Sequence, residues 1–357
     1  MLYTPGPTEM AEEIRKIGSD PLPYFRSTEY CSHVIELTEN LRYLFQTENT
    51  PLTITASGTA GMEMALVNLF NPGDQVVFIN GGTFGAKWGQ LARNLGLETI
   101  EVVCGHGRDL SLSRILEAIS THTKGLLLTA HETSTGQLYN IKEISCALEN
   151  QDIFVVVDGV SSIGSDPFKM DEWGIDCAIS CSQKGLACMP GLVFVAFSDR
   201  ARYRIHQTNH YRGYLDARIY FDNIGRGMLP YTPAIHATYQ VARKLDIIRD
   251  MGIDGYINQH LLRANAFRRE ITSDCNFGIF PESPSNALSA INLPYGVSAG
   301  SLIEIMRLKY NAILPLNPTK SDVFIRVSHM GDQSVVDIVQ LAKWLRYESN
   351  NLLMDSI

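Results

Sequence analysis

The stretch Asp176-Cys177-Ala178-Ile179-Ser180-Cys181-Ser182-Gln183-Lys184-Gly185-Leu186 places a lysine shortly after an apolar run. The run Cys177–Cys181 predicts a buried strand, and Lys184 follows its carboxyl end, where α/β enzymes position their chemistry. A second apolar run, Ile153–Val157, leads directly into Asp158. A lysine or an aspartate after a strand is usually a solvated loop residue or a helix cap, so neither is informative alone.

Together, Lys184 and Asp158 meet the requirements of pyridoxal phosphate, which forms a Schiff base with a lysine and needs a carboxylate opposite its ring nitrogen. A further motif supports this prediction. Ala56-Ser57-Gly58-Thr59-Ala60-Gly61 follows a predicted strand and opens a helical pattern. Amides and hydroxyls in such a loop are suited to binding an anion. The alternative is a tight turn that binds nothing, since the loop is neither a Walker loop nor Gly-x-Gly-x-x-Gly.

Three more segments carry side chains suited to this site. Phe84 lies between glycines after a strand and could stack on a pyridine ring, with core packing as the alternative. Hydroxyls in His131-Glu132-Thr133-Ser134-Thr135-Gly136 could hold a phenolate oxygen, with a capping turn as the alternative. Arg326 lies in the apolar run Phe324–Val327 and needs a partner, either an internal carboxylate or that of a substrate.

The composition predicts a soluble protein with one large and one smaller domain, because 45% of the 357 residues are hydrophobic and 19% are charged. A net charge of −8 offers nothing to attract nucleic acid. No apolar run reaches the length of a membrane span, and no signal peptide is visible. The seven cysteines form no Cys-x-x-Cys pair, which favours a reducing cytoplasm and argues against a metal site or disulfides.

The order of elements predicts an α/β fold with a mostly parallel sheet covered by helices on both faces. The expected strands are Leu52–Thr55, Gln75–Ile79, Gly125–Thr129, Ile153–Val157, Cys177–Cys181 and Leu192–Phe197. After about residue 234 the pattern indicates a smaller α+β domain. Its expected helices and strands are Ala237–Met251, Ile257–Thr272, Ala287–Leu293, Ser298–Lys309, Val323–Val327 and Asp332–Tyr347. We expect an N-terminal segment (1–20) packed on the small domain or a partner, a large domain (21–250) and a small domain (251–357).

Taken together, the motifs resemble those of the class V aminotransferases, which are fold type I pyridoxal-phosphate enzymes with a seven-stranded sheet. The resemblance covers nearly the whole chain and is carried by Thr4-Pro5-Gly6-Pro7-Thr8, Ser57-Gly58-Thr59, Phe84-Gly85, His131–Gly136, Val157-Asp158-Gly159-Val160-Ser161-Ser162, Ser182-Gln183-Lys184, Tyr231-Thr232-Pro233 and Arg326. The chain looks most like alanine–glyoxylate and serine–pyruvate aminotransferases. That likeness implies a homodimer with active sites at the interface. It also implies transfer of an amino group from an alanine-like or serine-like amino acid to glyoxylate or pyruvate.

The resemblance also implies residue roles. Lys184 would form the Schiff base, and Asp158 would pair with the ring nitrogen. The ring would lie between Phe84 and Val160, Thr133 would bond its phenolic oxygen, and Arg326 would bind the substrate carboxylate. The phosphate would be held by Ser57, Gly58, Thr59 and Gln183, with Tyr231 and Thr232 from the partner subunit.

Some features depart from the family pattern, and alternatives stay open. Phe25-Arg26-Ser27 stands where the family often has His-Arg-Ser. Related cysteine desulfurases usually carry histidine before the lysine and as the stacking residue, so Gln183 and Phe84 disfavour sulfur transfer. The alternatives are a 2-aminoethylphosphonate–pyruvate transaminase, a lyase or desulfurase on the same fold, and a cofactor-binding protein without catalysis.

Overall fold

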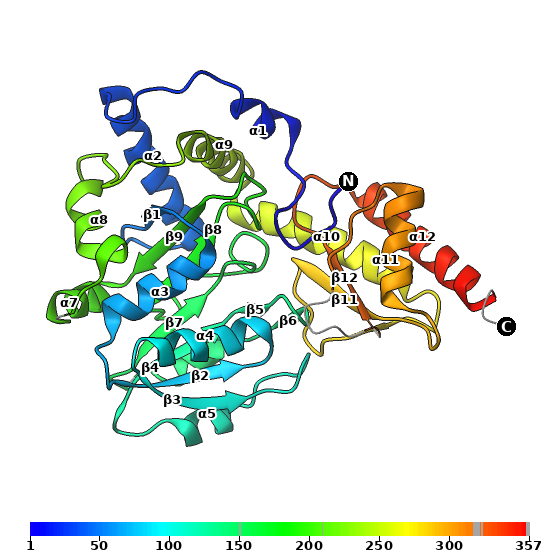
Figure 1. Ribbon diagram of the computed structural model, residues 1–357, viewed down its shortest axis with the longest axis horizontal. Coiled ribbons are helices and arrows are strands. Elements are labelled where there is room, and N and C mark those ends of the chain that lie inside the picture. Colours follow the sequence, from blue (N-terminus) through cyan, green and yellow to red (C-terminus); the bar gives the residue numbers. More distant parts are fainter. Residues whose placement is uncertain (150, 209, 317–321, 323, 355–357) are drawn as a thin grey trace.

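The computed structural model describes residues 1–149, 151–208, 210–316, 322 and 324–354. Its main feature is a seven-stranded sheet in the order β1-β9-β8-β7-β4-β2-β3 (Figure 1). Among the described strands of this sheet, β9 alone runs in the direction opposite to the others. The fold is therefore the mostly parallel α/β arrangement that the sequence predicts. The strands are β1 (Leu52–Thr55), β2 (Gln75–Asn80), β3 (Glu98–Val103), β4 (Thr123–Thr129), β7 (Phe154–Asp158), β8 (Cys177–Cys181) and β9 (Leu192–Phe197).

The predicted strands of the large sheet agree with the structure to within two residues, but β3 was not predicted. This strand lies at the edge of the sheet and pairs only with β2 among the described strands. Glu98 and Glu101 are exposed, and Val102 is its only fully buried side chain. Because one side of an edge strand faces water, its sequence lacks the continuous apolar run by which the buried strands are recognised.

Helices cover both faces of the sheet because side chains alternate between two cores along each strand. On β2, Val77 and Ile79 join one core, whereas Val76 and Phe78 join the other. The first core is closed by α1 (Glu12–Ile17), α2 (Thr28–Phe45), α5 (Leu112–Ala118), α6 (Ile141–Cys146) and α9 (Ile235–Met251). The second is closed by α3 (Gly58–Leu69), α4 (Thr83–Asn94), α7 (Asp199–Gln207) and α8 (Ala217–Ile224). No described helix is long and apolar enough to cross a membrane.

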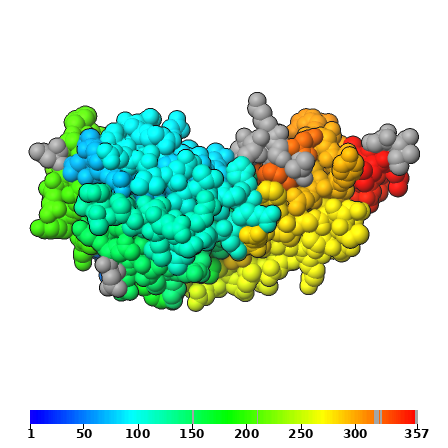
Figure 2. Space-filling view, turned by 90° about the horizontal axis from the view of Figure 1, so that it is seen from below, coloured from blue at the N-terminus to red at the C-terminus, as the bar shows by residue number. Residues whose placement is uncertain are grey.

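The C-terminal part forms a separate antiparallel sheet with its own core, and it extends the molecule to one side (Figures 1 and 2). Its elements are α10 (Ile253–Ile271), β10 (Gly278–Ile279), β11 (Leu288–Asn292), α11 (Ala299–Tyr310), β12 (Phe324–Ser328) and α12 (Val335–Met354). Each element predicted beyond residue 251 overlaps one of these, but α10 begins four residues before the predicted start and α12 ends seven residues after the predicted end. Strand β10 was missed, and Val323 lies outside the described residues. Helix α10 packs Tyr256 in the large core and Phe267 in the small one. A boundary between residues 250 and 251 therefore stays a prediction.

The N-terminal segment runs along the small sheet before it reaches the large one, as the dark blue trace in Figure 1 shows. Leu2 forms a bridge with Ile313, and Glu9 forms one with Gly331. The amide of Ser328, at the end of β12, donates to the carbonyl of Tyr3 at 2.9 Å. These contacts fix the backbone between residues 3 and 9 beside the carboxyl ends of the large sheet.

Candidate active site

A cavity of about 270 Å³ lies at the carboxyl ends of β4, β7 and β8. Parallel strands bring their carboxyl ends to one edge of a sheet, so residues far apart in the sequence meet there. The predicted site residues that line the cavity are Ser57, Gly58, Thr59, Phe84, Thr133, Asp158, Val160, Gln183 and Lys184. Arg326, Tyr231 and Thr232 are not among its lining residues.

Lys184 is half-buried under the N-terminal segment. Its Nζ donates to the carbonyl of Pro5 at 2.6 Å. Gly6 has φ +138°, and a Cβ atom there would lie 2.6 Å from Cδ of Lys184, so glycine is required for this close approach. Burial lowers the pKa of Lys184, although the negative charge of Asp158 opposes this effect. The amine is therefore biased toward its neutral, nucleophilic form.

Asp158 is the last residue of β7 and is buried. One carboxylate oxygen accepts from the amide of Val160 at 2.9 Å. Within the described residues, the other oxygen has no hydrogen bond partner. Burial raises the pKa of Asp158 to about 6, while the Val160 amide and Lys184 partly offset this rise. A cationic donor placed at the free oxygen would stabilise the ionised form, and a protonated ring nitrogen is such a donor.

Helix α3 begins at the cavity without an internal cap. The side chain of its N-cap residue, Ser57, accepts no capping hydrogen bond, and the first turn contains no acidic residue. Among the described residues, no acceptor bonds the amides of Gly58 and Thr59. Gly61 in the same turn packs so closely on the sheet that a Cβ would lie 2.7 Å from Ile179 and Val193. The helix start is therefore held firmly on the sheet with its amides open to an anion.

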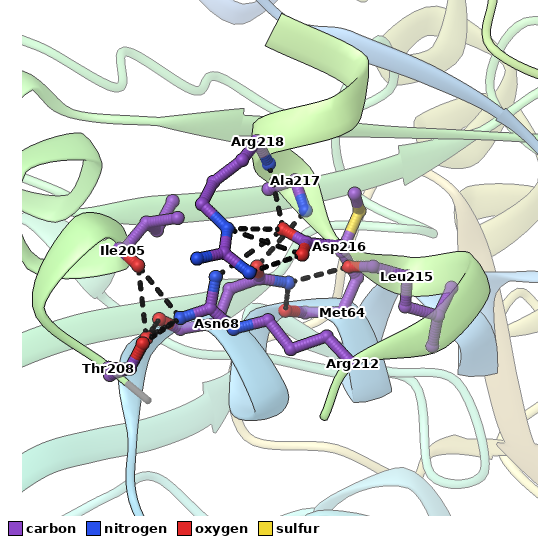
Figure 3. A network of polar contacts seen from close by, with 9 residues as sticks. All are labelled: Met64, Asn68, Ile205, Thr208, Arg212, Leu215, Asp216, Ala217 and Arg218. Atoms are coloured by element: carbon purple, nitrogen blue, oxygen red, sulfur yellow. Dashed lines mark hydrogen bonds and ion pairs between the residues drawn. The ribbon is translucent and has the colours of Figure 1, made fainter. Parts of the chain in front are cut away.

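The far end of α3 is fixed by a polar network, which Figure 3 shows. The side-chain amide of Asn68 donates to the carbonyl of Leu215 at 2.7 Å and accepts from the amide of Ala217 at 3.0 Å. The hydroxyl of Thr208 donates to the Asn68 carbonyl at 3.0 Å, and the buried guanidinium of Arg212 bonds the Thr208 carbonyl at 2.7 Å. The network connects α3 to the chain around α8, so both ends of the helix are held.

Helix α4 also begins near the cavity, but a buried carboxylate occupies its start. Glu132 is 1% exposed and accepts from the amides of Phe84 and Gly85, the latter at 2.9 Å. It also accepts from the Ser134 hydroxyl at 2.5 Å. Sequence reasoning considered only the hydroxyls of this segment and missed Glu132. Its role depends on the contact between β5 (His131–Glu132) and α4, which no local pattern reveals.

Two hydroxyls meet on one wall of the cavity. Thr133 and Ser161 lie 2.8 Å apart through their hydroxyl oxygens, and both line the cavity. His131 lies behind them, with its Nδ1 3.2 Å from the Ser161 carbonyl. Burial lowers the pKa of His131 to about 3, so its ring is neutral. The sequence predicts a contact with the cofactor for Thr133, but it predicts no functional contact for Ser161.

Arg326 lies on β12, behind this wall, and is 5% exposed. Its guanidinium donates to the carbonyls of Thr133 at 2.9 Å and Leu316 at 2.6 Å, and its Nε is buried without a partner. Burial lowers the pKa of Arg326 to about 10, which leaves it charged at neutral pH. Among the described residues it forms no ion pair. Arg326 therefore does not line the cavity, but it places a cation next to it whose charge Glu132 offsets only in part.

Tyr231 and Thr232 lie away from the cavity of their own chain. The Tyr231 ring stacks on Tyr214 with centroids 4.4 Å apart. Tyr231 is half-buried, and Thr232 is exposed at the surface. The prediction that they act in the site of a partner subunit is not tested by a single chain.

The residues around the cavity fit pyridoxal phosphate. Lys184 is an amine of lowered pKa, and Asp158 is a buried carboxylate with one oxygen free, at neighbouring strand ends. The open start of α3 is suited to a phosphate. Phe84 and Val160 both line the cavity and offer the apolar surfaces that an aromatic ring needs.

Comparison with known proteins supports the same conclusion. Residues 24–303 match the model of the family "Aminotransferase class-V". The chain is 31% identical to a serine–glyoxylate aminotransferase of Methylorubrum extorquens, over 95% of this chain and 88% of that protein. It is 28% identical to a protein of Synechococcus sp. named "Soluble hydrogenase, small subunit", over 93% and 88%. An aspartate aminotransferase structure from Thermus thermophilus superposes with a TM-score of 0.92 at 26% identity, covering 98% and 99% of the two chains.

The match to the family model spans most of the chain, and Lys184 and Asp158, for which the sequence predicts catalytic roles, line one cavity. The chain therefore belongs to the class V aminotransferases and is a pyridoxal-phosphate-dependent transaminase.

Proposed function

We propose that this enzyme moves the amino group of a small α-amino acid, alanine-like or serine-like, to glyoxylate or pyruvate. The observation that carries the proposal is the guanidinium of Arg326, a buried cation that bonds two carbonyls and, among the described residues, no carboxylate. A substrate α-carboxylate is a planar acceptor that can engage such a fork at two points. The serine–glyoxylate relative supports the substrate class.

Lys184 would move the proton at the substrate Cα. The lowered pKa of its amine favours the neutral, basic form, and the Pro5 carbonyl 2.6 Å away orients the amine when it is free. The bound cofactor would supply an electron-accepting ring that stabilises negative charge at Cα. Asp158 would hold a proton on the ring nitrogen through its free carboxylate oxygen. Thr133 would donate to the phenolic oxygen, and Phe84 and Val160 would fix the plane of the ring.

Substrate placement would depend on the wall that Thr133 and Arg326 share. The Thr133 carbonyl accepts from Arg326, while the Thr133 hydroxyl faces the cavity beside Ser161. A carboxylate bound by Arg326 would therefore bring the amino acid's Cα toward Lys184. Gln183 would join Ser57, Gly58 and Thr59 around the phosphate.

We also propose that the enzyme works as a homodimer in the cytoplasm. Tyr231 and Thr232 lie outside the cavity of their own chain, so a second copy would supply them to complete the phosphate site. The seven cysteines are all free in the structure, which is compatible with a reducing compartment.

The test is a panel of amino donors mixed with the pyridoxal form, with conversion to the pyridoxamine form followed by absorbance. Alanine and serine should react fastest in the wild type. In Arg326→Ala, loss of the charge-assisted contact should weaken amino acid binding by about 2 to 5 kcal/mol. Arg326→Lys should recover only part of the loss, because an ammonium lacks the planar fork.

Amines without a carboxylate serve as the internal control, since they should react equally poorly with the wild type and Arg326→Ala. An equal loss for amines and amino acids would remove Arg326 from the substrate site. Faster reaction with 2-aminoethylphosphonate than with alanine or serine would contradict the proposed substrate class. Repeated turnover of one substrate alone would instead indicate a lyase.

A further inference from the structure

Lys87 is a cation beside the open start of α3 to which sequence reasoning gave no role. It lies in the second turn of α4, and its Nζ is 3.2 Å from the Thr59 hydroxyl. The same Nζ lies 5.2 Å from the centroid of the Phe84 ring. Its charge also acts on both Asp158 and Lys184. Lys87 therefore sits at the rim of the cofactor cavity, between the loop and the stacking ring.

Lys87 places a full positive charge beside the open start of α3. The amino-terminal end of a helix carries a partial positive charge, and a lysine adds to it. The start of α4 is neutralised by Glu132, but Glu132 already bonds the amides of Phe84 and Gly85. The start of α3 has no acidic residue in its first turn. Among the described residues, Lys87 forms no ion pair, and the negative charge that it acts on, Asp158, lines the cavity without contacting it.

We infer that Lys87 binds the phosphate of the cofactor and thereby selects the phosphorylated cofactor over the unphosphorylated one. The inference rests on the proposed placement of the phosphate at Ser57, Gly58 and Thr59. The phosphate would then receive amides from the helix start, hydroxyls from the loop and one full positive charge from Lys87. Lys87 would contribute through its charge, which the same Nζ also places over the Phe84 ring.

The experiment compares binding of pyridoxal phosphate and pyridoxal to the cofactor-free enzyme, by absorbance and fluorescence titration. Lys87→Met removes the charge and keeps an unbranched apolar stem over Phe84. We expect the Kd for pyridoxal phosphate to rise by about tenfold to a hundredfold, which is the usual range for losing a hydrogen bond to a charged group. The Kd for pyridoxal should stay within about twofold. Lys87→Arg should restore most of the preference for the phosphate.

A second readout follows the bound phosphate itself. Phosphorus NMR of the loaded enzyme reports the pH at which the phosphate gains a proton, whose ordinary pKa is about 6. A nearby cation stabilises the dianion, so this pKa should be higher in Lys87→Met than in the wild type. Lys16→Met, at an exposed lysine on α1, removes the same charge far from the cavity and should change neither measurement.

Each other outcome has a definite meaning. An equal loss for pyridoxal and pyridoxal phosphate would show that Lys87 acts by packing on Phe84, and it would overturn the inference. An unchanged Kd for both, in a wild type that binds the cofactor and transaminates, would overturn it as well. A wild type that binds no pyridoxal phosphate would instead contradict the cofactor site as a whole.

Discussion

The starts of α3 and α4 face the same cavity, yet they are neutralised in opposite ways. The amides at the start of α4 bond a buried carboxylate of the chain, Glu132. The amides at the start of α3 have no acceptor among the described residues, and the side chain of Ser57 caps nothing. The start of α4 is completed by a side chain of the protein itself, and we propose that the start of α3 is completed by a ligand anion. The second helix start is recognised because no acidic residue lies in its first turn and a lysine stands beside it.

The largest expected effect comes from removing the internal anion. Glu132→Ala leaves the amides of Phe84 and Gly85 without an acceptor and removes negative charge near Arg326. We expect the cofactor-free enzyme to lose about 3 to 5 kcal/mol of unfolding free energy, as for other broken buried charge networks. Urea denaturation measures this loss. A loss below about 1 kcal/mol would mean that water replaces the carboxylate and that the two helix starts are alike.

The second effect distinguishes two buried carboxylates by their partners. Glu132 has several donors, whereas Asp158 has only the Val160 amide among the described residues. Burial raises the pKa of Asp158 to about 6, so the folded state binds this proton more tightly than the unfolded state. The stabilising contribution of Asp158 is therefore complete below about pH 4 and is lost as the pH rises through about 6.

Asp158→Asn should remove this pH dependence. Relative to the wild type, the cofactor-free variant should gain about 2 to 3 kcal/mol of unfolding free energy between pH 4 and pH 7. This gain in unfolding free energy should be smaller in the cofactor-loaded enzyme, where a protonated ring nitrogen would compensate the carboxylate. Transamination by the variant should be severely slowed. Urea denaturation across this pH range is the measurement. If the difference in unfolding free energy between variant and wild type stays constant from pH 4 to pH 7, Asp158 ionises at its ordinary pKa.

The smallest effect tests whether Ser57 is reserved for a ligand. Ser57→Ala should leave the stability of the cofactor-free enzyme unchanged, because the hydroxyl makes no capping bond. It should reduce the extra stability given by pyridoxal phosphate by about 1 kcal/mol. The matched control is Ser27→Ala, since Ser27 caps α2 by accepting from the amide of Tyr30 at 3.2 Å. That variant should lose about 1 kcal/mol with or without the cofactor. A loss of stability in cofactor-free Ser57→Ala, with no change in the stabilisation by pyridoxal phosphate, would contradict the contrast between the two helix starts.

Most of the fold was predictable because the central strands are buried on both faces. Strands such as β7 and β8 are then continuous apolar runs, and their ends are marked by Asp158 and the segment before Lys184. The edge strand β3 was not predictable from the same signal, because solvent on one side permits Glu98 and Glu101. The short strand β10 has only two residues, which is too few for any periodic pattern.

The site was predictable where one residue type has one specialised use. A strand-end lysine and aspartate identified the cavity, and the family resemblance added Val160 and Gln183, which the structure places there. Glu132 lies within the motif His131–Gly136 and Lys87 follows Phe84 by three residues, but their roles depend on contacts across the fold. An acid one residue before Thr133 and a lysine three residues after Phe84 are ordinary surface residues by local pattern. Only the tertiary structure shows what each one faces.

The contacts of the N-terminal segment imply an order in which the parts of this site can fold during synthesis. The Leu2 carbonyl accepts from the side chain of Gln333, a residue 331 positions later. During synthesis the segment that covers Lys184 emerges first, but the residues that hold it emerge near the end. The central sheet can form while the chain is still on the ribosome, whereas the cover over the lysine must wait. Until the last strand and helix are in place, the nascent enzyme is a folded sheet with an unfinished catalytic centre.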